Sequence, residues 1–200
     1  MQLPSSRYEE IKRKVVEIFK ITREGAIPVN PFCIAHKLGI RMVPYTSLEE
    51  GGARAACAIS ESGFKCYLAP SNKTPLHFIF YNDKMNQGRI RFTILHEIGH
   101  IVLGHMQESD VAEAEANFFA KYAIAPPMLV YHIRPNDYTE IEDTFDLSRE
   151  CALNAWSYYC KWTRITGFTD YEQELESLFT VMTEKGGGRS VKRLRMKKGA

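Results

Sequence analysis

Residues 91–103 form the segment that most constrains how this chain can fold. The segment reads RFTILHEIGHIVL, and at 100° per residue its aliphatic side chains gather on one side of a helix. His96 and His100 fall together on the opposite side, with Glu97 beside them. We therefore expect a helix that buries one face in a core and presents imidazoles on the other.

The two histidines are spaced as ligands of one metal ion. Side chains four residues apart on a helix converge, and two imidazole nitrogens can then bind a zinc ion at about 2.1 Å. A glutamate directly after the first histidine can take a proton from a water at the metal, which is the HExxH arrangement. We predict His96 and His100 as metal ligands, Glu97 as the catalytic base, and Zn²⁺ as the cofactor, with Mn²⁺ as an alternative. Gly99 costs a helix about 1 kcal/mol relative to alanine and indicates that another element approaches closely there.

A zinc ion needs a third protein ligand, and we expect it in residues 110–127, which read DVAEAEANFFAKYAIAPP. On a helical wheel Glu115 lies in the middle of the apolar face, whereas Glu113 lies on the polar face that is expected to contact solvent. A carboxylate directed into a core is costly unless it is paired or bound to a metal, so this pattern favours Glu115 as the ligand. Glu113 is assigned to helix capping with Asp110. His105 follows the end of the first helix and is expected to be an outer or surface residue.

The remaining pattern predicts an α+β fold with a small antiparallel sheet. Short β-prone stretches separated by turn residues predict strands, at 40–45, 56–60, 65–69 and 76–82. Apolar periodicity and end signals predict helices, at 8–20 after a capping box of Ser6 with Glu9, at 31–38 between Asn30 and Gly39, and at 88–103, 110–125, 139–145, 148–163 and 170–183. We expect a metallopeptidase domain over 1–135, a helical subdomain over 136–184 and a disordered basic tail over 185–200.

Composition indicates the cellular compartment and the classes of ligand to expect. The five cysteines are odd in number and form no CxxC motif, and the charged N-terminal stretch does not resemble a secretory signal. No apolar run approaches the roughly 20 residues of a membrane span. These features predict a cytoplasmic protein. Six of the 26 basic residues lie in 186–200, which leaves 20 basic and 24 acidic residues elsewhere. Nucleic acid is therefore not an expected ligand, apart from weak contact by the tail.

The stretches RFTILHEIGHIVLGH and EAEANFFAKYAIAPP resemble the ImmA/IrrE family of bacterial and phage metallopeptidases. The similarity is close over 76–130 and looser to about 165, where TFDLSRECALNAWSYY is similar to that family's helix-turn-helix-like part. FIFYND resembles the family's edge strand beside the cleft. The resemblance implies a zincin-like, gluzincin-type core with His96, His100 and Glu115 as ligands and Glu97 as base. The tail after residue 185 departs from the family pattern.

The same resemblance implies a helix-turn-helix repressor as the substrate, cut at one or few bonds to release stress or mobile-element genes. The alternative is a catalytically weak or inactive regulator that binds its partner as an antitoxin does. A closed structural zinc site is disfavoured, because no cysteine lies near 96–115. A hydrogen-bond donor is expected to help the metal stabilise the oxyanion formed during peptide hydrolysis. The candidates are Tyr81, Tyr131 and His132, and the sequence does not choose among them.

Overall fold

The computed structural model describes residues 2–69, 75–164 and 168–185, and it confirms the α+β class. The helices are α1 (Ser5–Thr22), α2 (Pro31–Lys37), α3 (Glu50–Ile59), α4 (Gln87–Val102), α5 (Asp110–Ile124), α6 (Pro127–Ile133), α7 (Tyr138–Phe145), α8 (Arg149–Trp162) and α9 (Asp170–Lys185), with a 3-10 turn η1 (Tyr45–Ser47). The strands are β1 (Arg41–Pro44), β2 (Gly63–Leu68) and β3 (Leu76–Tyr81). The predicted tail, 185–200, lies outside the described residues apart from Lys185, which ends α9.

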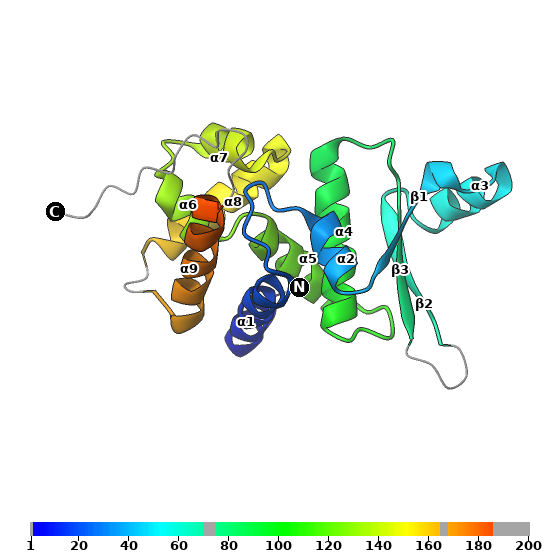
Figure 1. The fold of residues 1–200 in the computed structure, drawn as a ribbon, viewed down its shortest axis with the longest axis horizontal. Coiled ribbons are helices and arrows are strands. Elements are labelled where there is room, and N and C mark those ends of the chain that lie inside the picture. The colour runs from blue at the N-terminus through cyan, green and yellow to red at the C-terminus, as the bar shows by residue number, and fades with distance from the viewer. Residues whose placement is uncertain (1, 70–74, 165–167, 186–200) are drawn as a thin grey trace.

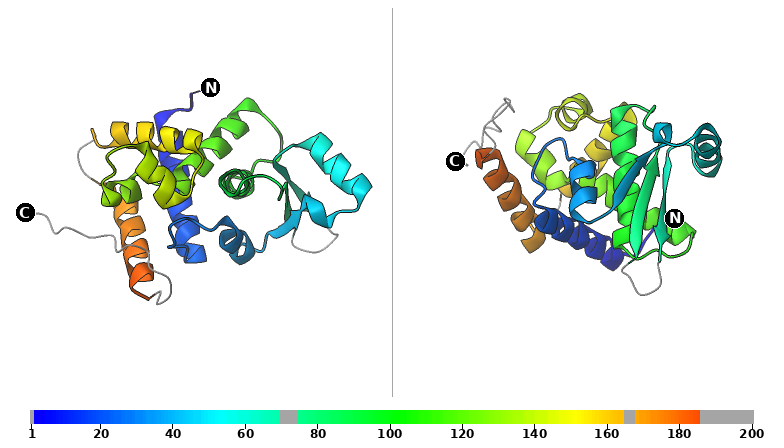
Figure 2. Two further views of the ribbon diagram at one scale, coloured as in Figure 1. Left: turned by 90° about the horizontal axis from the view of Figure 1, so that it is seen from above. Right: turned by 45° about the vertical axis from the view of Figure 1, so that its right-hand side comes forward.

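Helix α4 lies at the centre of the molecule, with the sheet on one side and α5 on the other (Figure 1). The left panel of Figure 2 looks along α4 and shows the C-terminal helices beyond α5, on the side away from the sheet. Ile94, Leu95 and Ile98 are fully buried, as the apolar stripe predicts. Packing on two sides explains why so much of this helix is buried, including part of its polar face.

Local signals explain where the helices that carry the site begin and end. The Asn86 side chain accepts a hydrogen bond from Arg89 N at the start of α4, and Ser109 accepts one from Ala112 N at the start of α5. Gly104 follows α4 with φ +75°, a conformation that favours glycine. The capping box predicted at Ser6 is wrong, because the residue before α1 is Pro4 and no side chain caps that helix.

The sheet differs from the prediction in two respects. Its strand order is β1-β3-β2, with β2 antiparallel to β3 but β1 parallel to it, so the sheet is mixed. The strand predicted at 56–60 is instead part of α3, whose alanine-rich sequence EGGARAACAI favours a helix. The FIFYN stretch lies in the central strand β3, and the free edge near α4 therefore belongs to β2.

Gly99 allows α4 and α5 to approach closely, as the sequence indicates. A Cβ atom at this position would lie 3.1 Å from ring atoms of Phe119, which is fully buried. The close approach brings the start of α5 beside the histidines of α4.

Gly63 also allows β2 to lie close to α4, and we predict that Gly63→Ala destabilises the fold. The new Cβ would lie 2.7 Å from both the backbone oxygen of Phe80 and Thr93 Cγ2, so backbone has to shift. Overpacking of this kind lowers the free energy of unfolding by about 1–3 kcal/mol, measurable by chemical denaturation. Gly52→Ala is the control, because its Cβ meets only Leu48 Cβ at 3.5 Å and stability should not fall. Equal stability of wild type and Gly63→Ala would contradict this reading of the packing.

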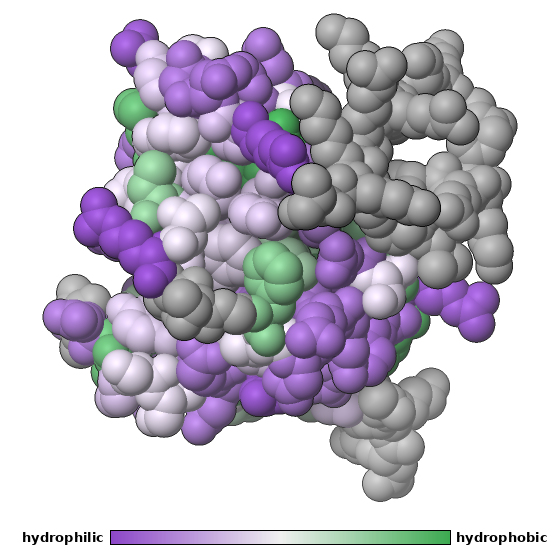
Figure 3. All heavy atoms as spheres, turned by 90° about the vertical axis from the view of Figure 1, so that its left-hand side faces the viewer, coloured by the Kyte–Doolittle hydropathy of each residue, from purple (hydrophilic) through white to green (hydrophobic). Residues whose placement is uncertain are grey.

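The face formed by the C-terminal helices is largely hydrophilic where Figure 3 shows it. Its hydrophobic residues stand as separate spots, which is the character of an ordinary solvated surface. Among the described residues, no helix combines the length and the apolar character that crossing a membrane requires.

Candidate metal centre

Three side chains from two helices meet at one point. His96 and His100 come from α4 and Glu113 comes from the first turn of α5, and their ligating atoms all lie within 4.8 Å of one another. His100 Nε2 lies 3.0 Å from His96 Nε2 and 3.0 Å from Glu113 Oε1, and Glu113 Oε2 lies 3.4 Å from His96 Nε2. Ligands bound at about 2.1 Å around a tetrahedral ion lie about 3.4 Å apart. The donor set therefore fits a zinc-sized ion with only a small outward adjustment.

Both histidines have their lone pairs available at neutral pH. Burial, together with the neighbouring His96 and His105, lowers the pKa of His100 to about 3. Burial also lowers the pKa of His96, against the opposing effects of Glu113 and of a hydrogen bond with Asn117. A neutral imidazole is the form that binds a metal, so the local environment favours ligation over protonation.

Glu97 has a buried carboxyl group that contacts the edge strand β2. Its Oε2 accepts a hydrogen bond from Lys65 N at 3.0 Å, and the residue is 8% exposed. Burial raises the pKa of Glu97 to about 7, although the Lys65 N–H opposes the shift. A carboxyl with a pKa near neutrality can accept a proton and return it within one reaction, which is what a general base in peptide hydrolysis has to do.

The structure brings Glu113, and not the predicted Glu115, to the two histidines. Glu115, the residue favoured on the helical wheel, does not belong to that group and is buried against Arg7 and His105. Arg7 Nε and Nη2 each donate to one Glu115 oxygen at 2.7 Å, and this pairing holds the pKa of Glu115 below its usual range. Glu113 occupies the place predicted for Glu115.

The physical reason is that a hydrolytic site has to reach solvent. The first turn of α5 lies on the solvent-exposed side of the metal centre, and the Glu113 side chain is half exposed. Asn117 lies one turn further along the same solvent-facing side of α5 and forms a hydrogen bond with His96. The sequence did not predict a role in the site for this residue either. The pattern of residues i and i+4 on α5 repeats the spacing of the two histidines on α4, and this repetition is the signal that could have found both residues.

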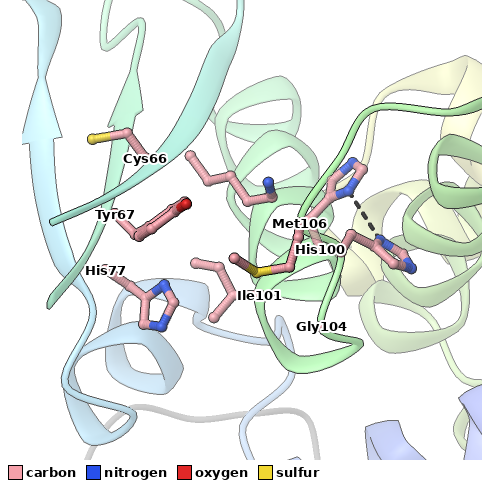
Figure 4. Close-up of a pocket in the computed structure, with 9 residues that line it drawn as sticks. Cys66, Tyr67, His77, His100, Ile101, Gly104 and Met106 are labelled. Carbon is pink, nitrogen blue, oxygen red and sulfur yellow. Dashed lines mark hydrogen bonds between the residues drawn. The ribbon is translucent and has the colours of Figure 1, made fainter. Parts of the chain in front are cut away.

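A pocket of about 270 Å³ opens beside His100, between β2 and the end of α4 (Figure 4). Lys65, Cys66, Tyr67 and His77 line it from the sheet side, and His100, Ile101, Gly104, His105 and Met106 line it from the other. Tyr67 and Met106 are 51% and 69% exposed, so the pocket has an accessible, partly apolar wall. Figure 4 shows the side chains of Tyr67 and Met106 on opposite sides of this space.

Two of the candidate oxyanion donors are engaged in other contacts. His132 Nε2 lies 2.9 Å from Glu176 Oε1 of α9, and the Tyr131 ring packs on Trp162 of α8 at 5.9 Å between centroids. Tyr81 packs edge-on against Phe32, with the ring centroids 5.5 Å apart. None of the three lines the pocket beside His100.

Comparison with known proteins agrees with this site. Residues 58–157, half of the 200-residue chain, match the family described as IrrE N-terminal-like domain (Peptidase_M78). The matched range contains His96, Glu97, His100 and Glu113. Searches of curated proteins and of solved structures found no match. The chain therefore belongs to the IrrE N-terminal-like family of metallopeptidases, the family to which its HEIGH and EAEANFFA stretches point.

Proposed function

We propose that this protein is a zinc-dependent endopeptidase that cuts a helix-turn-helix repressor at one or few bonds and so releases stress or mobile-element genes. The observation that carries the enzymatic part is the convergence of His96, His100 and Glu113 directly beside a buried Glu97. The repressor is proposed from the family resemblance, in which metallopeptidases of this kind act on a protein substrate.

The side chains divide the chemistry between them. His96, His100 and Glu113 hold the metal, which when bound supplies a Lewis acid that polarises a peptide carbonyl and acidifies a water. Glu97 takes the proton from the attacking water and returns it to the leaving amine. Its hydrogen bond from Lys65 N fixes the carboxylate in place for both transfers. Asn117, through its hydrogen bond, orients the ring of His96.

The edge of β2 is the proposed docking strand for the substrate. Lys65 N points out of the sheet toward Glu97, and alternation along an antiparallel strand turns the backbone groups of Tyr67 to the same free edge. An extended substrate segment that pairs there passes the metal centre and can place one side chain in the pocket near Ile101 and Met106. This arrangement favours a flexible linker in the substrate over a folded domain.

Incubation with the repressor encoded beside this protein tests the proposal. With zinc or manganese supplied, wild type should convert the repressor into two or three fragments of defined mass, and casein should be cut far more slowly. Intact-mass spectrometry reads both reactions. If wild type and a Glu97→Gln variant both leave the repressor intact but bind it tightly, a binding role without turnover would replace the peptidase proposal.

Two further predictions accompany the proposed function. A transcriptional repressor acts in the cytoplasm of a bacterial cell, so we place the reaction there. The division into a peptidase domain over 1–135 and a helical subdomain over 136–184 also stays a prediction.

A further inference from the structure

A chain of polar contacts leads from the metal centre to the N-terminal helix. His100 turns its Nε2 to the centre, and its Nδ1 lies 3.0 Å from His105 Nδ1, the contact dashed in Figure 4. His105 Nε2 lies 2.8 Å from Glu115 Oε2, and both oxygens of Glu115 accept hydrogen bonds from Arg7 at 2.7 Å. The side chains of His105 and Glu115 are only 10% and 8% exposed.

The helix end places His105 in this chain. Leu103 caps α4, Gly104 takes the left-handed conformation at φ +75°, and His105 N donates to His100 O at 3.0 Å. Gly104 N also donates to Ile101 O at 3.2 Å, so the backbone forms a Schellman-type turn. The turn folds His105 back over His100, and the backbone itself therefore fixes the contact between the two rings.

With a metal at His100 Nε2, the contacts fix one proton arrangement. A metal at His100 Nε2 requires that nitrogen to be unprotonated, so the proton sits on Nδ1 and is donated to His105 Nδ1. The proton of His105 then lies on Nε2 and is donated to Glu115. Arg7, whose fork matches a carboxylate, completes the chain.

We propose that His105, Glu115 and Arg7 are positioning residues that hold His100 in the tautomer and orientation required for metal binding. The inference rests on the metal centre of the proposed function and adds to it. It also ties α1, which lies outside the residues that match the family, to the strength of metal binding.

Zinc affinity, measured by competition with a chromophoric chelator, tests the proposal without any substrate. His105→Phe keeps a ring and removes both nitrogens, and it should weaken zinc binding by about 10–100-fold, the usual effect of losing such an outer partner. His105→Asn retains an acceptor in place of Nδ1 and should recover part of this loss. His36→Phe, at an exposed position of α2, is the matched control and should bind zinc as wild type does.

The outer link is tested in α1 itself. Arg7→Gln should weaken zinc binding by a smaller factor than His105→Phe, whereas Arg13→Gln, which removes an exposed pair with Asp170, should have no effect. Circular dichroism checks folding, and if His105→Phe does not fold, Glu115→Gln takes its place with the same expectation of weaker binding.

The outcomes separate this proposal from the one on which it rests. A wild type that binds no zinc would overturn the metal centre itself. A wild type that binds zinc tightly, with His105→Phe or its Glu115→Gln replacement binding equally tightly, would overturn the positioning role alone.

Discussion

Glu97→Gln is expected to retain zinc at the wild-type level and to lose cleavage of the proposed repressor substrate almost completely. The amide cannot accept a proton from water, and positioned general bases contribute roughly 10²–10⁴-fold to rate. The side chain is not among the three donors of the centre, so the metal should stay. Zinc analysis and the initial rate of repressor cleavage, made on the same preparation, measure the two properties together.

Glu61→Gln is the matched control for this experiment, because Glu61 is exposed between α3 and β2 and is not among the groups that shift the pKa of Glu97. That variant should cleave at the wild-type rate. Cleavage by Glu97→Gln at the rate of the control would show that another group moves the proton, and the role of Glu97 would then be wrong.

Glu113→Gln is expected to lose zinc far beyond the roughly 10–100-fold expected for residues that only orient a ligand. The substitution replaces an anionic oxygen donor by a neutral amide, and only two histidines remain. Glu113 is half exposed and lies in the first turn of α5, where losing a negative charge costs about 0.3–1 kcal/mol of stability. The metal-free variant should therefore stay folded. Zinc content after dialysis, with a thermal melt in parallel, measures both effects.

Glu115→Gln provides the contrast. It removes the charge paired with Arg7 but none of the three donors, so it should bind zinc with only the moderate loss described above. If Glu115→Gln loses the metal completely and Glu113→Gln keeps it, the helical-wheel prediction would be right and the arrangement in the structure wrong.

The features predicted best from the sequence are those that depend on one helix. The faces of α4 and the convergence of His96 and His100 both follow from a repeat of 3.6 residues per turn. The ends of α2 also agree, because Asn30 and Gly39 act locally. No distant part of the chain is needed to decide these features.

The third ligand depends on residues far apart in the sequence. A buried glutamate needs a partner, and the partner of Glu115 is an arginine 108 residues earlier, which no local pattern indicates. Arg7 satisfies Glu115, which leaves the solvent-facing Glu113 for the metal centre. Burial alone is therefore a poor guide to ligands in a site that has to admit water and substrate.

The arrangement of the sheet also depends on contacts between residues far apart in the sequence. The alternation in ACAIS resembles a strand, but helix propensity and packing beside η1 place it in α3. The parallel pairing of β1 with β3 depends on the path of the chain between them, through α3 and β2, and no local pattern specifies that path. Position in the sheet is what decides that β2, and not β3, carries the free edge.

A crystal structure of the zinc-loaded protein, with anomalous diffraction measured at the zinc edge, tests the central claim most directly. We expect one anomalous peak at about 2.0–2.2 Å from His96 Nε2, from His100 Nε2 and from a carboxylate oxygen of Glu113. Glu115 should remain paired with Arg7. A peak bound to Glu115, or no peak between the two histidines, would contradict it.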